Sequence, residues 1–372
     1  MRIINVKDMG LETVEKLLQK PAFDQVELNP RIREANKKTF GADLTAAEIV
    51  DMIVSDVRRN GDAAVIKYTK LIDKTDFTSE EFAVTEAEYE AAYKEADPAV
   101  VESLRKAAEN VRHYHQEQKP NSWMTYRDKG SILGQSVIPL DRVGIYVPGG
   151  TAAYPSSVIM NAMPAVVAGV KEIIMMVPPK NGKINPYVLV AAKEAGVSKI
   201  FKIGGAQAIA AMAFGTETIP RVDKITGPGN IFVTLAKKAV YGHCDIDMLA
   251  GPSEILIVAD KTADPAYTAA DMLSQAEHDM LASSIVITDS PELAEKVAVE
   301  AEKQLKVLPR EEITRASLDR NGMIIITENI IQAVELANVS APEHMEVLTE
   351  QPFQLLPYIR HAGAVFLGAY SP

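Results

Sequence analysis

The sequence has almost no cysteine, and this shortage limits both its chemistry and its location. Cys244 is the single cysteine among 372 residues, so no disulfide can form within the chain. Thiol-poor chains of this size are typical of reducing compartments. The first ten residues also lack the charged and then apolar pattern of a secretory signal. We therefore expect a cytoplasmic protein that folds without covalent cross-links.

Long apolar runs and an excess of positive charge are also missing. Pro164, Gly169, Lys171 and Glu172 interrupt the longest apolar stretch, residues 158–177, before it provides the roughly 20 residues of a membrane span. We expect a helix, a turn and a buried strand there instead. The 39 Lys and Arg against 50 Asp and Glu give a net charge of −11. Attraction to nucleic acid or to anionic lipid is therefore not expected.

The remaining composition is that of a folded protein with two domains. Hydrophobic residues make up 47% and charged residues 24% of the chain, as in soluble globular proteins. A length of 372 residues exceeds one ordinary domain of roughly 100–200 residues. Up to Lys119 the apolar residues recur at helical spacing, as in residues 44–59 and 98–118. This first part is expected to be a helical scaffold.

From Val143 onward, short apolar runs alternate with Gly or Pro turns and helical patterns. This alternation is typical of a doubly wound parallel sheet, and it predicts an α/β fold. The predicted strands are 143–147, 173–177, 199–203, 224–226, 254–259, 284–288, 323–327 and 364–367.

Glycine-rich turns adjoin several of these strands. They are YVPGG at 146–150, GGAQA at 204–208, TGPGN at 226–230 and, before a strand, AGPSE at 250–254. None is a GxGxxG fingerprint, so the spacing does not indicate a standard dinucleotide site. Ligands of open α/β sheets bind beyond the carboxyl ends of the strands. We therefore expect the chemistry in these turns.

Gln275 and His278 are candidate metal ligands. Asp264 can cap the helix that precedes them, and Pro265 suits its first turn. A spacing of three residues places both side chains on one helix face, where they can converge on one ion. Zinc usually takes about four ligands, and a carboxamide is a weaker ligand than imidazole. A capping or core histidine explains an isolated pair of this kind equally well.

Glu343 and His344 are candidate proton acceptors. Pro342 introduces a turn and sets the two residues side by side at the start of a new element. Histidine titrates near neutrality, and a neighbouring carboxylate in a low-dielectric site suits general-base catalysis. The alternative is a helix-start acid beside a surface histidine.

The other reactive side chains give weaker signals. Ser253 stands in a tight turn before a strand, where its hydroxyl can face a cleft or simply serve the turn. No base or cation lies near Cys244 in the sequence, so a buried apolar role is expected rather than a nucleophilic one. The remaining histidines are assigned to the surface or to structure: His113, His115, His243 and His361.

Six motifs in order resemble the histidinol dehydrogenase family. They are VGIYVPGGTA at 143–152, IGGAQAIAAMAFGT at 203–216, ITGPGN at 225–230, AGPSEILIVAD at 250–260, LSQAEHD at 273–279 and SAPEHMEV at 340–347. The resemblance spans the chain to Pro372. It implies an NAD-linked, zinc-dependent oxidation of L-histidinol to L-histidine by a homodimer with shared active sites.

The resemblance also implies roles for particular residues. Gln275 and His278 match zinc ligands that also lie against the substrate, and Glu343 and His344 match the paired proton acceptors, with His344 also contacting the substrate. Ser253 matches a substrate contact. The positions matching NAD contacts are Tyr146, Gln207 and Asn230.

The architecture that the resemblance implies is similar to that of aldehyde dehydrogenases, with two Rossmann-like lobes. We expect a helical arm at 1–25, a first lobe of 26–128 plus 241–372 that carries zinc, substrate and proton acceptors, and an NAD-side lobe at 129–240. The family pattern continues past Pro372 with a further zinc ligand, a substrate Glu and a zinc-binding His that reaches the partner's site. A chain ending at Pro372 is accordingly expected to bind zinc weakly.

Two other functions remain open at this stage. Zinc, NAD and the Glu343–His344 pair would equally serve a related dehydrogenase acting on another amino alcohol or on a sulfonated diol. An inactive, truncated α/β scaffold without metal is the alternative from a different class.

Overall fold

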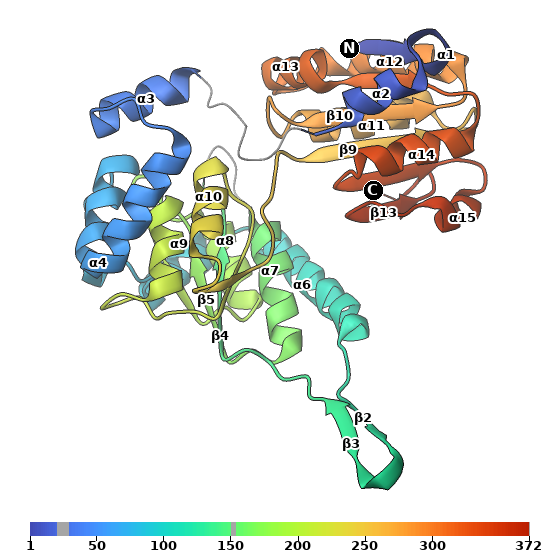
Figure 1. Ribbon diagram of the computed structural model, residues 1–372. Helices are drawn as coiled ribbons and strands as arrows, with labels where there is room; N and C mark the ends of the chain where they lie inside the picture. The colour runs from blue at the N-terminus through green and yellow to red at the C-terminus, as the bar shows by residue number, and fades with distance from the viewer. Residues whose placement is uncertain (21–29, 150–153, 372) are drawn as a thin grey trace. The chain divides into compact units, whose positions relative to one another are not determined.

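The computed structural model describes residues 1–20, 30–149 and 154–371, with the side chains of residues 30 and 31 also left out. These residues fall into two compact units (Figure 1). Unit 1 is formed by residues 1–25 and 251–372, and unit 2 by residues 26–250. Both contain a parallel sheet, as the sequence predicts.

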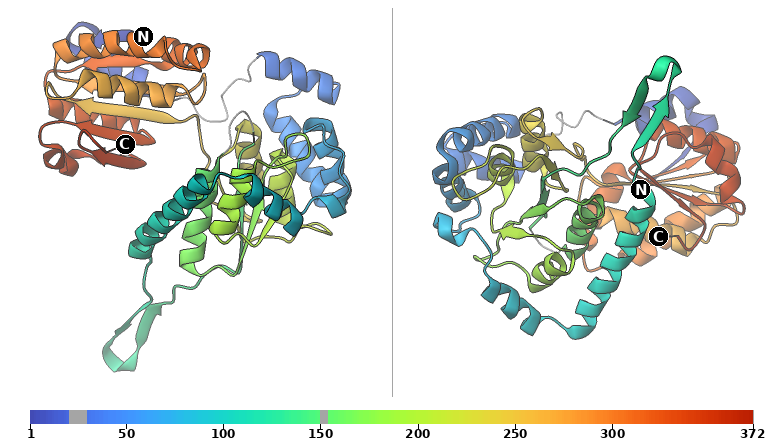
Figure 2. Two further views of the ribbon diagram at one scale, coloured as in Figure 1. Left: turned by 180° about the vertical axis from the view of Figure 1, so that it is seen from behind. Right: turned by 90° about the horizontal axis from the view of Figure 1, so that it is seen from below.

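Unit 1 is built on a six-stranded parallel sheet in the order β1-β11-β10-β9-β12-β13. Helices cover both of its faces, one with α1, α2 and α14 and the other with α11, α12 and α13 (Figure 2). Its elements are β1 (Arg2–Asn5), α1 (Val6–Met9), α2 (Leu11–Leu18), β9 (Glu254–Ala259), α11 (Pro265–Ala276), β10 (Ser283–Thr288), α12 (Pro291–Leu305), α13 (Glu311–Asn321), β11 (Met323–Ile326), α14 (Ile330–Ser340), β12 (His344–Leu348), α15 (Pro352–Leu355), the 3₁₀ turn η4 (Leu356–Tyr358) and β13 (Ala364–Leu367).

Unit 2 is built on a five-stranded parallel sheet in the order β6-β5-β4-β7-β8. Helices α5 to α8 pack on one face, and α4, α9 and α10 pack on one another on the other. Its elements are α3 (Pro30–Phe40), α4 (Ala46–Ile72), η2 (Ser79–Glu81), α5 (Glu86–Glu95), α6 (Pro98–Gln118), β2 (Trp123–Tyr126), η3 (Asp128–Gly130), β3 (Ile132–Gln135), β4 (Arg142–Tyr146), α7 (Pro155–Ala168), β5 (Glu172–Met176), α8 (Pro186–Glu194), β6 (Lys199–Phe201), α9 (Gly205–Phe214), β7 (Lys224–Thr226), α10 (Ile231–Val240) and β8 (Asp245–Ile246).

Local sequence signals set many of these boundaries. Thr45 and Glu48 form a capping box at the start of α4, and Asp264 caps α11 with Pro265 in its first turn. The apolar stretch at 158–177 forms most of α7, a turn and β5, as expected. No helix among the described residues is both long and apolar enough to cross a bilayer.

The division into units differs from the expected lobes in three places. Residues 241–250 belong to unit 2 and not to the first lobe, because β8 pairs with β7. Residues 26–128 belong with the sheet of unit 2, because α4 packs against α9 and α10 and α6 packs against α7. The first 25 residues are not a separate helical arm, because β1 pairs in parallel with β11 and extends the sheet of unit 1. The strand was not predicted because the helical spacing of apolar residues dominates the first hundred residues.

The two sheets share one strand order. Numbered along the chain from β9 in unit 1 and from β4 in unit 2, both read 3-2-1-4-5, with β1 added beyond the third strand of unit 1. This is the doubly wound order in which the chain reverses direction between the first and fourth strands. The reversal lies between β9 and β12 in unit 1 and between β4 and β7 in unit 2.

Candidate active site

The candidate residues of unit 1 lie at the amino edge of its sheet. Ser253 precedes β9, and His344 begins the neighbouring strand β12 with Glu343 just before it. Helix α11 follows β9 and returns along the sheet, so its last turn brings Gln275 to the same edge. These candidates therefore lie at the edge opposite to the carboxyl ends of the strands.

The carboxyl edge of this sheet is closed by hydrogen bonds. Asp260 follows β9, and its carboxylate accepts the backbone N–H groups of Thr262 and Glu350 at 2.8 and 2.9 Å. The Asp260 N–H also donates to the carbonyl of Leu348, the last residue of β12. These bonds tie the loops after β9 and β12 together.

His344 lies between two of the predicted partners. Its Nδ1 lies 3.1 Å from Gln275 Oε1, and its Nε2 lies 3.9 Å from Glu343 Oε1. Because a carboxamide oxygen only accepts, Nδ1 carries the proton and Nε2 keeps a free lone pair. The Glu343 side chain remains half exposed, and its Oε2 accepts the N–H of Glu254 at 3.3 Å. The structure thus joins three of the predicted residues, His344, Gln275 and Glu343, at one edge of the sheet.

His278 lies close to this group along the chain. Helix α11 ends at Ala276, so His278 stands two residues beyond the helix and not within it as expected. Its N–H donates to the Gln275 carbonyl at 3.2 Å, and its side chain is exposed. In the described ranges, no three or more His, Cys, Asp or Glu side chains gather as a metal-binding group.

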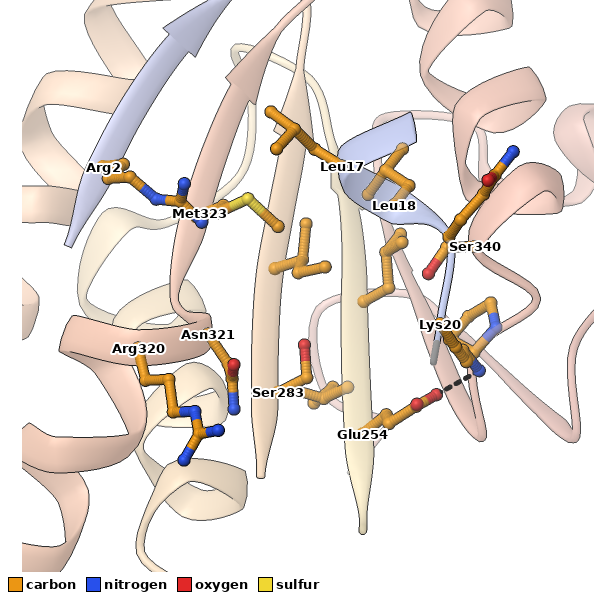
Figure 3. A pocket seen from close by; sticks show the side chains of 15 residues that line it. Arg2, Leu17, Leu18, Lys20, Glu254, Ser283, Arg320, Asn321, Met323 and Ser340 are labelled. Atoms are coloured by element: carbon orange, nitrogen blue, oxygen red, sulfur yellow. Dashed lines mark hydrogen bonds and ion pairs between the residues drawn. The ribbon is translucent and has the colours of Figure 1, made fainter. Parts of the chain in front are cut away.

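A cavity of about 160 Å³ opens at the same edge of the unit 1 sheet (Figure 3). Lys20 lies at its rim, where its ammonium pairs with Glu254 and donates to the Ala341 carbonyl at 2.8 Å. Glu254 adjoins Ser253, and Ala341 precedes the turn that leads to Glu343. Lys20 therefore ties the two loops of the candidate site together. Its position in the N-terminal segment gave no sequence signal for this contact.

In unit 2, Tyr146 and Gln207 meet at the carboxyl edge of the sheet. Tyr146 ends β4, and its buried hydroxyl accepts the N–H of Gly205 at 3.1 Å. Burial raises the pKa of Tyr146 to about 12. Gln207 is fully buried in the first turn of α9, and its Oε1 has no hydrogen-bond partner among the described residues. These candidates therefore lie at the carboxyl edge, where the sequence pattern places them.

Asn230 reaches the same edge through the neighbouring strand. It caps α10 by accepting the N–H groups of Phe232 and Val233 at 3.1 and 3.2 Å. The turn before it requires glycine, since Gly227 has φ of +118° and a Cβ there would stand 2.1 Å from the Tyr146 carbonyl oxygen. Tyr146 and Asn230 thus flank the reversal of strand order between β4 and β7. Residues 150–153 of the first glycine-rich motif lie outside the described residues.

Asp73 joins this second group, although the sequence did not single it out. It follows α4, and its Oδ2 accepts the Gln207 side-chain N–H at 3.1 Å. Burial raises the pKa of Asp73 to about 6.

The weaker candidates take the structural places expected of them. Cys244 is buried, and burial raises the pKa of its thiol to about 11. His243 packs edge-on against Phe214, and His361 Nδ1 contacts the Asn338 carbonyl at 3.1 Å. His113 lies exposed on α6 beside Glu109.

Known proteins decide between the possible families. The family model described as histidinol dehydrogenase matches residues 36–372. A histidinol dehydrogenase from Halalkalibacterium halodurans is 56% identical over 323 residues, which cover 87% of this chain and 76% of that protein. The chain belongs to the histidinol dehydrogenase family. It is therefore an oxidoreductase.

Solved structures agree with this membership. A crystal structure of histidinol dehydrogenase from Elizabethkingia anophelis aligns with a TM-score of 0.89 at 35% identity, covering all of this chain and 81% of that one. A NAD-dependent benzaldehyde dehydrogenase from Corynebacterium glutamicum aligns with a TM-score of 0.51 at 14% identity, covering 89% of this chain and 88% of that one. This second likeness concerns the fold alone. The α/β architecture of this histidinol dehydrogenase family member is thus similar to that of aldehyde dehydrogenases.

Proposed function

We propose that this protein oxidises L-histidinol to L-histidine through histidinal, with two NAD as hydride acceptors, in the final steps of histidine biosynthesis. The observation that carries the proposal is His344, held between Gln275 and Glu343 with Nε2 free. Membership of the family whose relatives are named histidinol dehydrogenase supports the substrate. An alcohol oxidation needs a base for the hydroxyl proton, and this imidazole suits that task.

The first oxidation uses His344 as the base. The Nδ1–H bond to Gln275 fixes the ring, so Nε2 faces the proton that it removes from the substrate hydroxyl. Ser253, at the same sheet edge, is proposed to contact the substrate. NAD, when bound, would supply the acceptor for the hydride of the carbinol carbon.

The second oxidation uses Glu343. An aldehyde gives up a second hydride once water has added to its carbonyl, and a half-exposed carboxylate is well placed to take a proton from that water. A cysteine thioester is the usual alternative in aldehyde oxidation. Cys244 does not serve this purpose, because it is buried and its thiol pKa is raised to about 11.

Gln275 and His278 are proposed to hold zinc, which would fix the amino alcohol and polarise its oxygen. The two residues offer an oxygen and an imidazole nitrogen at one edge of the sheet, which fits half of a tetrahedral set. The other positions would be taken by groups outside the described residues, the substrate among them. Gln275 can serve both roles because a carbonyl oxygen has two lone pairs.

Tyr146, Gln207 and Asn230 are proposed to bind NAD at the carboxyl edge of unit 2. Nucleotide cofactors of doubly wound sheets occupy the crevice where the strand order reverses, which here lies between β4 and β7. The buried Gln207 Oε1 lacks a partner in the part of the chain that the structure describes, so an amide or hydroxyl donor of a ligand would satisfy it. Helix α9 also begins at this edge without a side-chain cap.

We further propose a homodimer with shared active sites. The β2–β3 hairpin extends from unit 2 (Figure 1) and exposes Met124 and Tyr126 by 74% and 76%. A two-stranded hairpin alone is marginally stable, and exposed apolar side chains of this density mark an interface.

Sedimentation of a variant tests the dimer. Met124→Lys should shift the sedimenting species from dimer to monomer. The control Tyr241→Lys changes an exposed side chain of unit 2 outside the hairpin and should leave the dimer intact. A monomeric wild type would contradict the proposal.

Reaction stoichiometry tests the proposed chemistry. Wild-type protein supplied with zinc should form two NADH for each histidinol consumed. A ratio of one would indicate a simple alcohol dehydrogenase. Turnover of another amino alcohol or of a sulfonated diol in place of histidinol would move the proposal to a related enzyme, and a protein that neither binds zinc nor forms NADH would be an inert scaffold.

Single substitutions separate the two proposed bases. His344→Asn should lower the first oxidation by roughly 10²- to 10⁴-fold, whereas His361→Asn removes another histidine of the same unit and should not. Glu343→Gln should slow aldehyde oxidation more than alcohol oxidation, with Glu350→Gln as its exposed control. Equal loss of both steps in the Glu343 variant would contradict its assignment to the second one.

A further inference from the structure

Strand β12 and helix α11 make a second polar contact next to the one between His344 and Gln275. Glu346 lies two residues after His344 on the strand, and Asp271 lies one turn before Gln275 on the helix. Two residues along a strand and one turn along a helix cover similar distances, roughly 6 Å. Glu346 and Asp271 are in hydrogen-bond contact. The strand and helix are thus joined by two polar pairs in register.

The surroundings of Glu346 are apolar. Its side chain is only 5% exposed, and its strand neighbours are Ile257 on β9 and Phe366 on β13. The Phe366 ring also meets the His344 ring edge-on, with centroids 6.1 Å apart. Glu346 Oε2 has no partner in the hydrogen-bond network of the described residues, and no cation pairs with this carboxyl there. A second charge beside it would therefore be buried without compensation.

Two carboxyl groups in contact at such a place do not both ionise. Burial and the neighbouring Asp271 carboxylate both raise the pKa of Glu346. Burial also raises the pKa of Asp271, but Asp271 is less buried than Glu346, and the hydrogen bond from Glu346 offsets part of this rise. The proton therefore lies on Glu346, which donates to Asp271, and an O–H···O⁻ bond of this type is short and strong.

We propose that Asp271 and Glu346 share one proton and act as a positioning pair that holds Gln275 against His344. The pair fixes the last turn of α11 relative to β12, and so keeps Gln275 Oε1 within reach of His344 Nδ1. The expected effect of the pair on catalysis rests on the proposed function. Its expected effect on the His344 ring does not.

Three variants test the pair. Glu346→Gln keeps a donor to Asp271 and should resemble the wild type. Glu346→Leu fills the same space without a donor and should break the pair. Ser317→Ala serves as the control, because Ser317 is fully buried in the same unit and donates to the Ala282 carbonyl at 2.9 Å, away from β12. It should lose stability without altering the site.

The decisive readout is the protonation of the two ring nitrogens of His344, observed by ¹⁵N NMR of the full chain and assigned with His344→Asn. Wild type, Glu346→Gln and Ser317→Ala should show protonated Nδ1, and Glu346→Leu should lose this signature. Turnover should fall about tenfold in Glu346→Leu alone, through kcat rather than KM, as for other residues that orient a site group.

An unchanged ring in Glu346→Leu would overturn the proposal, and so would a Glu346→Gln variant that loses the signature as fully as Glu346→Leu. The expected ring pattern in a protein that does not oxidise histidinol would support the positioning pair while refuting the proposed function. The two failures are therefore distinguishable.

Discussion

Replacing Asp73 with Asn should stabilise unit 2 at neutral pH. Burial raises the pKa of Asp73 from 3.8 to about 6, so its ionised form is disfavoured in the folded protein. The difference between 3.8 and about 6, at about 1.4 kcal/mol per unit, corresponds to roughly 3 kcal/mol of folding stability. Asn carries no charge, and its amide can accept from Gln207 Nε2 while donating to the unpaired Gln207 Oε1.

The effect should depend on pH with a definite sign. Between pH 3.8 and about 6 the folded state binds more protons at Asp73 than the unfolded state, so wild-type stability falls as pH rises through this window. The Asn variant lacks this fall. Its advantage should therefore be small near pH 4 and reach about 2 to 3 kcal/mol above pH 6.

Cys244 provides the assay, because it is the single cysteine, lies in unit 2 and is 4% exposed. Pulsed thiol labelling after equilibration in urea reports the opening of this unit at each pH. Asp76→Asn is the control, since the Asp76 side chain is 70% exposed. An Asp73→Asn variant whose advantage does not change between pH 4 and pH 7, or which is less stable throughout, would refute the argument from burial.

Two further substitutions probe unit 2. Lys237 is 2% exposed, donates to the Gly227 carbonyl at 3.0 Å and pairs with Asp247. Lys237→Met should therefore lower the free energy of unfolding by about 3 kcal/mol in the same labelling assay. An unchanged free energy of unfolding would show that the buried ion pair is dispensable. Gly227→Ala forces a Cβ against Tyr146 and should weaken NAD binding about tenfold by calorimetry, or about 1.4 kcal/mol. Gly242→Ala has the same backbone strain, with φ of +97° and open space around it, and should retain NAD binding.

Much of the fold follows from local sequence patterns. The predicted strands 224–226, 254–259 and 364–367 coincide with β7, β9 and β13, because each is a short apolar run bounded by turn residues. The cap and proline at 264–265 fixed the start of α11. The strand β12 was not predicted, because Glu346 places a carboxyl group at a buried position where the pattern calls for an apolar residue.

The candidate site was only partly predictable for a related reason. The motifs identified Gln275, Glu343 and His344, but not the edge of the sheet where they meet. That edge depends on the return of α11 along β9 and on Asp260, which closes the opposite edge. Asp73, just after α4, and Asp271, within α11, were missed because charged residues at such places usually face solvent, and only tertiary packing brings these two against buried partners.

Strand β1, at residues 2–5, pairs with β11, which begins only at Met323. The two neighbours in the sheet are therefore far apart along the chain. During synthesis, residues 26–250 leave the ribosome and can fold as a unit before any other strand of unit 1 exists. The strand at 2–5 must wait, unpaired, until β11 has emerged. Closing so long a loop is slow, because its entropic cost comes before any contact rewards it. The pairing of β1 with β11 thus comes after the residues of unit 2 have been made, and a chain that stops before β11 would expose Ile4 and its neighbours to other strands.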